Sequence, residues 1–224
     1  MGEWLTLRDH LPHLLQGLVV TLIVWTGAAF LMLVCALVGG LARRSRDVIV
    51  RGFAVCYVEV FRGTSALVQL YWFYFALPLL LGIQLDALLV GIVVLGLNAG
   101  AYGAEIVRGA IQGVPEGQWR AALALNLTRW QTMRHVILPQ AVPAMLPPLG
   151  NLLIELLKGT ALVSMITVTD LTRSGLNIRD NTLLTTEIFV FLLVIYFLLS
   201  SCIATAMRGL ESFASRHITR GEVA

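Results

Sequence analysis

Long stretches without a charged side chain alternate with short charged segments along this chain. The first stretch runs from residue 10 to residue 42, with a core at about residues 14–41, and contains no Asp, Glu, Lys or Arg. Three more follow, at residues 63–85, 87–104 and 188–207. Each is long enough for a helix that crosses the hydrocarbon core of a bilayer, which needs roughly 20 apolar residues. The pattern predicts a transmembrane helix at each of these four places.

A fifth apolar stretch, residues 135–168, contains two ionisable groups, Glu155 and Lys158. Prolines also interrupt its first half, at Pro139, Pro143, Pro147 and Pro148. Because proline is tolerated in the first turn of a helix, we expect a helix that begins near Pro148 and spans residues 149–168. The sequence therefore predicts an all-α protein with about five transmembrane helices, folded as a single domain over residues 1–224.

Composition agrees with this interpretation. The chain is 58% hydrophobic and 13% charged, with a mean hydropathy of +0.82. Soluble domains carry about 25% charged residues. This balance excludes an ordinary water-soluble enzyme.

Basic residues are distributed unevenly between the two sides that such helices define. With the N-terminus outside, twelve of the 16 basic residues fall on the inner side: Arg43, Arg44, Arg46, Arg51, Arg62, Arg108, Arg120, Arg129, Arg134, Arg208, Arg216 and Arg220. Arg8, Arg173 and Arg179 fall outside, and Lys158 lies within a span. Because loops on the cytoplasmic side are enriched in Lys and Arg, we expect the N-terminus outside and the C-terminus inside. One large cytoplasmic loop, residues 105–147, then joins the third and fourth helices.

The sequence contains no recognisable motif for catalysis or for binding a nucleotide or a metal. The only lysine, Lys158, is followed by Gly159, so no Gly-x-x-x-x-Gly-Lys-Ser/Thr loop can hold a nucleotide. A net charge of +3, widely scattered, gives no reason to expect nucleic-acid binding. Cysteines and histidines show no metal-ligand spacing. We expect no catalytic residue, no metal and no cofactor.

The cytoplasmic loop contains signals for two short helices at an angle. Residues 118–125 are rich in Ala and Leu, and Asn126 is suited to the left-handed conformation that ends a helix. Thr128 and Gln131 are spaced as a capping box that begins the next helix. Apolar side chains that need a partner on this side are Ala121, Ala122, Leu125, Trp130 and Met133.

This loop resembles the Glu-Ala-Ala loop of bacterial ABC importer permeases, whose pattern is Glu-Ala-Ala, three residues, Gly, nine residues and Ile-x-Leu-Pro. Ala121, Ala122, Leu138 and Pro139 match it. Two positions depart from it, with Arg120 in the place of Glu and Asn126 in the place of Gly. Segments 57–64, 138–141, 146–151 and 156–160 also resemble the polar amino acid branch, and segments 61–67, 124–126 and 151–158 look most like the ectoine and hydroxyectoine permeases.

The resemblance implies the type I ABC importer permease fold in a bacterial inner membrane. It also implies partners: separate ABC ATPase subunits, a second permease subunit that is a copy or a paralogue, and a periplasmic or lipid-anchored solute-binding protein. The residues expected to couple the permease to the ATPase are Arg120, Ala121, Ala122, Asn126, Trp130, Leu138 and Pro139. The expected cargo is a small zwitterion, ectoine or hydroxyectoine, with a polar amino acid of the glutamate, glutamine, histidine or arginine type as the alternative.

Polar groups inside the spans are candidates for the solute path. Glu155 and Lys158 lie three residues apart on one helix face, with Asn151 one turn earlier, and charges at membrane depth are costly. They either line the path or form an ion pair that fixes the helix against a second subunit. Candidates on other spans are Trp72, Asn98 and Tyr102, each with the alternative of packing or hydrogen bonding between helices.

Two further Glu-x-x-Arg-Gly segments, at Glu59–Arg62 and Glu105–Arg108, place a carboxylate and a guanidinium on one helix face. They are either pairs at helix ends or parts of a cytoplasmic gate. For the chain as a whole, the alternative from another class is a stand-alone channel or ion-coupled carrier. Such a protein would transport without an ATPase.

Overall fold

The computed structural model describes residues 10–219, with side chains up to residue 214. Arg8 and Arg220, which entered the prediction of orientation, lie outside these residues, as does the side chain of Arg216. In chain order the described elements are α2 (Leu11–Ala42), α3 (Val48–Gly63), α4 (Ala66–Tyr71), the π-helix η1 (Trp72–Ala76), α5 (Leu77–Leu81), α6 (Ala87–Gln112), α7 (Glu116–Ala124), α8 (Arg129–Gln131), the π-helix η2 (Thr132–Ile137), α9 (Leu138–Gly159), the 3-10 helix η3 (Thr160–Ile166), α10 (Leu171–Thr182) and α11 (Thr185–Thr219). All elements in the described range are helical, which confirms the all-α prediction.

Four helical segments of the described chain are long and apolar enough to cross a membrane, and a bent pair of helices brings the number to five if the pair counts as one span. The bent pair corrects the second predicted span, residues 63–85. Helix α3 begins at Val48 and ends at Gly63, and the chain then turns by 104° into the segment Ala66–Leu81. Thr64 and Ser65 have extended backbone between the two helices. Counting charge-free residues missed α3 because Arg51, Glu59 and Arg62 lie within it.

Helices α2 and α6 pack along each other through small residues at the centre of the molecule. Gly103 on α6 lies against Ala36 on α2, where an added Cβ would be 2.6 Å from the Cβ of Ala36. Gly40 on α2 meets Val107 in the same way, at 2.7 Å. Close backbone contact of this kind is how helices gain packing energy where lipid leaves little hydrophobic driving force. The α2–α6 pair is therefore the scaffold on which the other helices are placed.

The fourth span begins earlier than predicted. Helix α9 starts at Leu138 rather than near Pro148, with Pro143, Pro147 and Pro148 inside it. Packing explains the earlier start. Ile137, Ala141 and Met145 recur every four residues, so they lie on one helix face, and they are at most 3% exposed. Burial of this stripe outweighs the local cost of prolines in the first turns.

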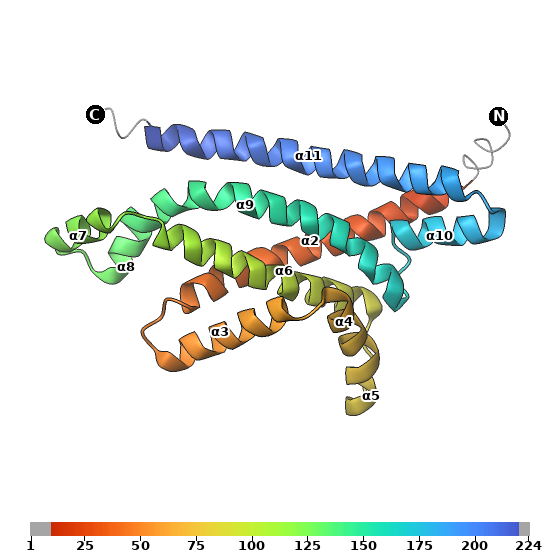
Figure 1. Ribbon diagram of the computed structural model, residues 1–224, viewed down its shortest axis with the longest axis horizontal. Coiled ribbons are helices and arrows are strands. Elements are labelled where there is room, and N and C mark those ends of the chain that lie inside the picture. The colour runs from red at the N-terminus through yellow and green to blue at the C-terminus, as the bar shows by residue number, and fades with distance from the viewer. Residues whose placement is uncertain (1–9, 220–224) are drawn as a thin grey trace.

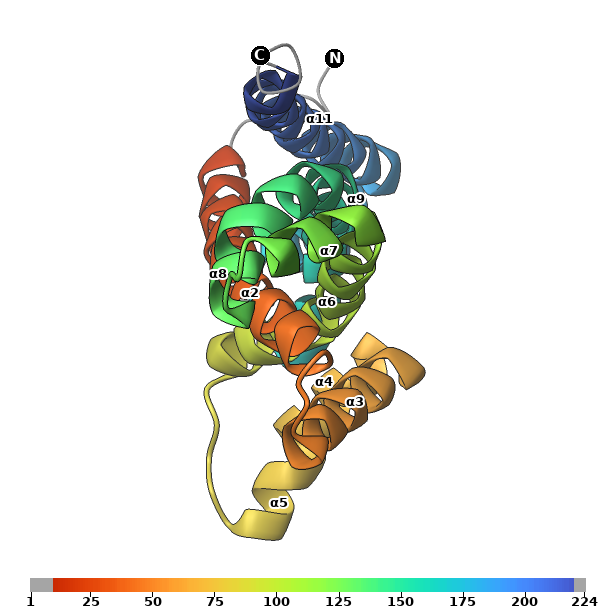
Figure 2. The ribbon, with the colours of Figure 1, turned by 90° about the vertical axis from the view of Figure 1, so that its left-hand side faces the viewer.

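A short amphipathic helix, α10, was not predicted. Asp170 begins it, because its side chain accepts a hydrogen bond from the backbone N–H of Arg173. Figure 1 places α10 at one end of the longest axis and α7 with α8 at the other. In Figures 1 and 2, α6 lies between α9 and α3, and α11 lies along the outer side of α9. The two ends of the molecule therefore carry different structures joined by the long helices.

Candidate functional site

The turn between α7 and α8 has the local structure expected from the sequence. Asn126 adopts the left-handed conformation, with φ of 53°. The backbone N–H of Gln131 donates to Thr128 Oγ1 at 3.3 Å, and Gln131 Oε1 accepts from the N–H of Thr128 at 2.8 Å. Both the helix stop and the capping box are confirmed.

Three large apolar side chains project from this turn without cover. Leu123, Leu125 and Trp130 are 68%, 73% and 68% exposed, and we call them the apolar tip. Ala122, which was expected to be part of an exposed surface, is 1% exposed and packs inside the chain. Ala121, by contrast, is exposed. Exposed apolar groups in such a cluster are typical of a surface that binds another protein.

Arg120 points its charge along its own helix. Its Nη2 donates to Glu116 Oε2 at 2.8 Å, one turn earlier on α7, and both side chains are largely exposed. An intrahelical pair of this kind is weak in water. The positive charge that departs from the permease pattern therefore has a partner on its own helix but stays open to solvent.

The base under the apolar tip is buried against the long helices. Val107 and Ile111 of α6 form a core cluster with Ile137, Ala141 and Met145, and Trp119 and Met133 pack on it. Gln140 Nε2 donates to Gln118 Oε1 at 3.2 Å and so joins α9 to α7. Leu138 and Pro139 form the first turn of α9 beside this cluster. The tip is attached to both α6 and α9.

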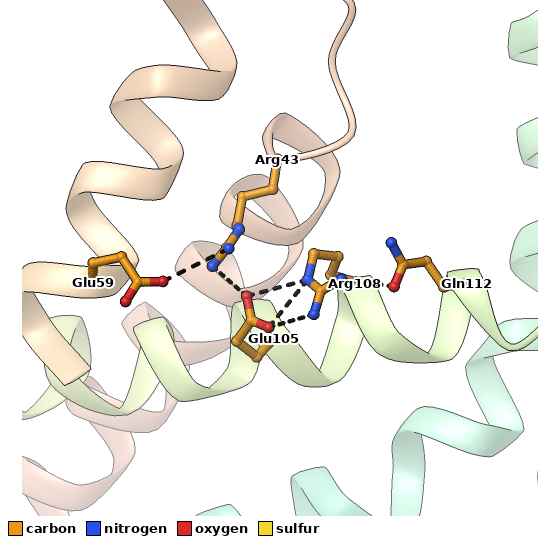
Figure 3. Close-up of polar contacts among 5 residues, drawn as sticks. All are labelled: Arg43, Glu59, Glu105, Arg108 and Gln112. Atoms are coloured by element: carbon orange, nitrogen blue, oxygen red, sulfur yellow. Dashed lines mark hydrogen bonds and ion pairs between the residues drawn. The ribbon is translucent and has the colours of Figure 1, made fainter. Parts of the chain in front are cut away.

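An ion network joins α6 to the end of α2 and to α3 (Figure 3). Glu105 pairs with Arg43, which caps α2, and with Arg108 at 2.7 Å on its own helix. Glu59 of α3 approaches Arg43 at 3.8 Å. Arg108 also donates to Gln112 Oε1 at 2.6 Å. Three helices therefore share one set of charges at this end.

The two Glu-x-x-Arg-Gly segments behave differently. Glu105 and Arg108 pair as expected, but Glu59 approaches Arg43 and does not pair with Arg62. The Arg62 guanidinium instead lies over the ring of Tyr102, 5.3 Å from its centre. The Tyr102 hydroxyl donates to the carbonyl of Arg62 at 3.4 Å. Tyr102, a candidate for the solute path, is thus bound to the end of α3.

Polar side chains satisfy the backbone where α3 ends. Asn98 Nδ2 donates to the Phe61 carbonyl at 2.9 Å and to Gln69 Oε1 at 3.1 Å. Gln69 Nε2 donates to the same carbonyl at 3.0 Å and to Thr64 Oγ1 at 2.6 Å. Backbone groups left without partners in a membrane cost several kcal/mol, roughly. Asn98 therefore holds the α3–α4 break, which is the hydrogen-bonding alternative considered for it.

Trp72 begins the π-helix η1, directly after α4. It is 47% exposed and lines a pocket of about 320 Å³ with Val68, Gln69 and Phe61. Trp72 also makes an edge contact with Phe73, with ring centres 5.2 Å apart. The structure therefore gathers Trp72, Asn98 and Tyr102 around the α3–α4 break.

The remaining candidates lie on α9. Asn151, Glu155 and Lys158 are all exposed and recur at helical spacing along one face. The described ion pairs do not join Glu155 to Lys158, so the ion-pair alternative is not formed within the single subunit. Two charges in an apolar span thus face outward from the single subunit.

A buried carboxylate at the α10 end was missed by the sequence analysis. Asp170 is 0% exposed, and its Oδ2 has no hydrogen-bond partner. Desolvation by burial raises the pKa of Asp170 to about 6, although hydrogen bonds from the backbone act in the opposite direction. The available signal was an Asp that starts an amphipathic helix.

Known proteins are similar to this chain over most of its length. The probable amino-acid ABC transporter permease protein y4tF of Sinorhizobium fredii is 42% identical, over 93% of this chain and 90% of its own. The glutamine transport system permease protein GlnP of Escherichia coli is 38% identical, over 93% and 96%.

Solved structures give the same result. A crystal structure of an amino acid ABC transporter with histidines matches with a TM-score of 0.86 and 35% identity, over 93% of this chain and 97% of that one. The MetNI methionine ABC transporter matches in fold, with a TM-score of 0.74 at 22% identity. The type I importer permease fold is thereby confirmed. The family model of the binding-protein-dependent transport system inner membrane component matches residues 36–215, and the chain belongs to this family of multi-pass inner membrane permeases.

Proposed function

We propose that this chain is the membrane subunit of an ATP-driven importer and that α7 and α8 bind a separate ATPase. The observation that carries the proposal is the exposed apolar tip, Leu123, Leu125 and Trp130, on a turn held by a capping box. Side chains of this kind are enriched where proteins bind each other. Of the predicted coupling residues, Trp130 is then a contact residue. Ala122, Asn126, Leu138 and Pro139 shape its support.

The buried cluster under the apolar tip connects the tip to the membrane helices. Trp119 and Met133 pack on a cluster that contains residues of both α6 and α9. Packed interiors transmit displacement because they are hardly compressible. A displacement of α7 by the ATPase would therefore move α6 and α9 together, and with them the groups that these helices carry.

The α9 face with Asn151, Glu155 and Lys158 is proposed to meet a second permease subunit across the solute path. Charges at membrane depth face a water-filled cavity or pair with a partner, because exposure to lipid is costly. Both groups lie on the outside of the described subunit. A five-helix subunit is also too small to enclose a path, so the second copy or paralogue completes it.

A polar amino acid is the substrate class we propose, ahead of ectoine. The relatives named above are an amino-acid permease and a glutamine permease. Opposite charges at Glu155 and Lys158 would complement the ammonium and carboxylate of an amino acid. Ectoine carries the same two kinds of charge and stays a prediction to be tested beside glutamine.

The orientation that we propose places α7 and α8 in the cytoplasm and α10 on the outer side. The distribution of arginines supports this orientation, because cytoplasmic segments are enriched in basic residues. In the described chain, more arginines lie at the α7–α8 end, among them Arg43, Arg44 and Arg46, than at the α10 end, which has Arg173 and Arg179. A solute-binding protein would then deliver its ligand at the α10 end.

The direct test is co-purification with the ABC ATPase subunit of the same importer. Leu125→Glu places a carboxylate on the apolar tip without disturbing the core, and we expect at least a tenfold loss of bound ATPase. Leu183→Glu is the matched control, because Leu183 is 83% exposed at the other end of the molecule. Equal ATPase binding by wild type and Leu125→Glu would overturn the docking assignment. Ala122→Asp is unsuitable because Ala122 is buried.

A further inference from the structure

A pocket of about 680 Å³ lies beside the apolar tip, between the end of α2, the first turn of α3 and the α7–α8 segment. Arg44, Arg46 and Arg129 line it together with apolar side chains. The apolar part consists of Leu41, Val50, Trp119, Leu123, Leu127 and Met133. We call this the basic pocket. It combines positive charge with apolar walls in one place.

The three arginines carry charge that the described chain does not neutralise. The described pocket lining contains no Asp or Glu. None of the described ion pairs involves Arg44, Arg46 or Arg129. Arg44 instead lies over the Trp119 ring, 5.4 Å from its centre.

The neighbouring residues behave differently. Arg43 is held by two glutamates, and the Asp47 carboxylate accepts the N–H of Ile49 at the start of α3. The basic pocket is therefore complementary to an anion.

The walls indicate which kind of anion fits. Val50 of α3 lines the pocket. On the same helix, Val48, Ile49 and Phe53 are 69%, 69% and 75% exposed. These three side chains lie within three positions of Val50, on a helix that belongs to the bent pair of candidate membrane segments. An inorganic anion makes no use of such walls, whereas a lipid brings a charged headgroup and acyl chains together.

We propose that the basic pocket binds the headgroup of an anionic phospholipid of the inner leaflet, with its acyl chains along the start of α3. The assignment to the inner leaflet rests on the orientation proposed above, whereas the assignment of the pocket does not. Basic pockets between helices on the cytoplasmic side are suited to such headgroups. Arg46 and Arg129 contact the phosphate, and Arg44 stays stacked on Trp119.

The ATPase is the alternative occupant of the basic pocket, because Leu123 lines the pocket and is also part of the apolar tip. Leu125 and Trp130, the other two tip residues, do not line the pocket. The pocket lining also includes Val50 of α3, a helix of the bent pair that is a candidate membrane span. These two observations favour lipid.

The test is native mass spectrometry of the purified permease, exchanged into detergent with phosphatidylglycerol or phosphatidylcholine. We expect phosphatidylglycerol to bind the wild type at least tenfold more tightly than phosphatidylcholine. Arg46→Gln/Arg129→Gln should bind it about thirtyfold more weakly, from the usual contribution of two basic residues near anionic lipid. Arg46→Lys/Arg129→Lys should keep most of the binding. The matched control, Arg134→Gln/Arg173→Gln, removes the same charge outside the pocket.

Three results would overturn the proposal. One is equal phosphatidylglycerol binding by the wild type and the Arg46→Gln/Arg129→Gln variant. Another is displacement of the lipid by millimolar inorganic phosphate, which would make the ligand a soluble anion. The third is stoichiometric displacement by the purified ATPase, which would assign the pocket to that protein. Since binding is measured without ATPase or solute, failure of the proposed coupling would leave this result interpretable.

Discussion

Asn98 on α6 donates a hydrogen bond of 2.9 Å to the carbonyl of Phe61, in the last turn of α3. The same amide reaches Gln69 of α4, so one side chain connects three helices at the 104° bend. The bend is thus fixed from the central scaffold and not by the residues of the turn alone.

Replacing this side chain should weaken the fold. We expect Asn98→Ala to lower the free energy of unfolding by about 1–3 kcal/mol, because the partly buried Phe61 carbonyl and Gln69 Oε1 each lose a donor. Denaturant unfolding in mixed micelles measures it. Gln112→Ala on the same helix is the control, since the described side-chain hydrogen bond of Gln112 is an exposed one, accepted from Arg108 Nη1. Equal stability of the two variants would contradict this role for Asn98.

The Arg43–Glu105 pair should contribute more than an exposed pair. Its side chains are 14% and 20% exposed, and it joins α2 to α6. A double-mutant cycle with Arg43→Gln and Glu105→Gln is expected to give a coupling free energy of about 1–3 kcal/mol. The same cycle at Arg120 and Glu116, 79% and 82% exposed, should give no more than about 0.5 kcal/mol. Similar values at both pairs would show that the network does not join the helices.

Asp170 should make stability depend on pH. Its pKa is raised from 3.8 to about 6 in the fold, so the folded state binds more protons than the unfolded state between these values. Stability therefore falls as the pH rises from about 4 to about 7, by up to about 3 kcal/mol. Asp170→Asn keeps Oδ1 for the N–H of Arg173 and should flatten this dependence. Melting temperatures of both proteins from pH 4 to pH 8 measure it, and parallel curves would refute it.

Glu155 and Lys158 should matter for transport more than for folding. Both are exposed on α9, so Glu155→Gln/Lys158→Met should insert normally and bind the ATPase. We expect at least a tenfold loss of solute uptake into proteoliposomes, with Arg173→Gln as a control for charge removal elsewhere. Unchanged uptake and selectivity in the double variant would remove both residues from the path.

Features set by adjacent residues were predictable from the sequence. The left-handed Asn126 and the Thr128–Gln131 capping box depend on backbone and side-chain preferences within a few positions, and both are present. Span number likewise follows from hydropathy, because a membrane leaves few alternatives to apolar helices.

Features set by contacts between helices were not predictable in this way. The early start of α9 depends on burial of Ile137 and Ala141 against α6, which no local proline rule contains. The partners of Asn98 lie 29 and 37 positions away. Glu155 and Lys158 have the spacing of an ion pair, but their exposed positions turn them toward the outside of the subunit.

The central claim, ATP-driven import through this subunit, is tested most directly by uptake of labelled glutamine into proteoliposomes. The permease would be reconstituted alone, and together with the ATPase and solute-binding protein of the same importer. The account predicts uptake only when all components and ATP are present, and its loss with Leu125→Glu. Uptake by the permease alone, without ATP, would contradict the account and establish a channel or ion-coupled carrier.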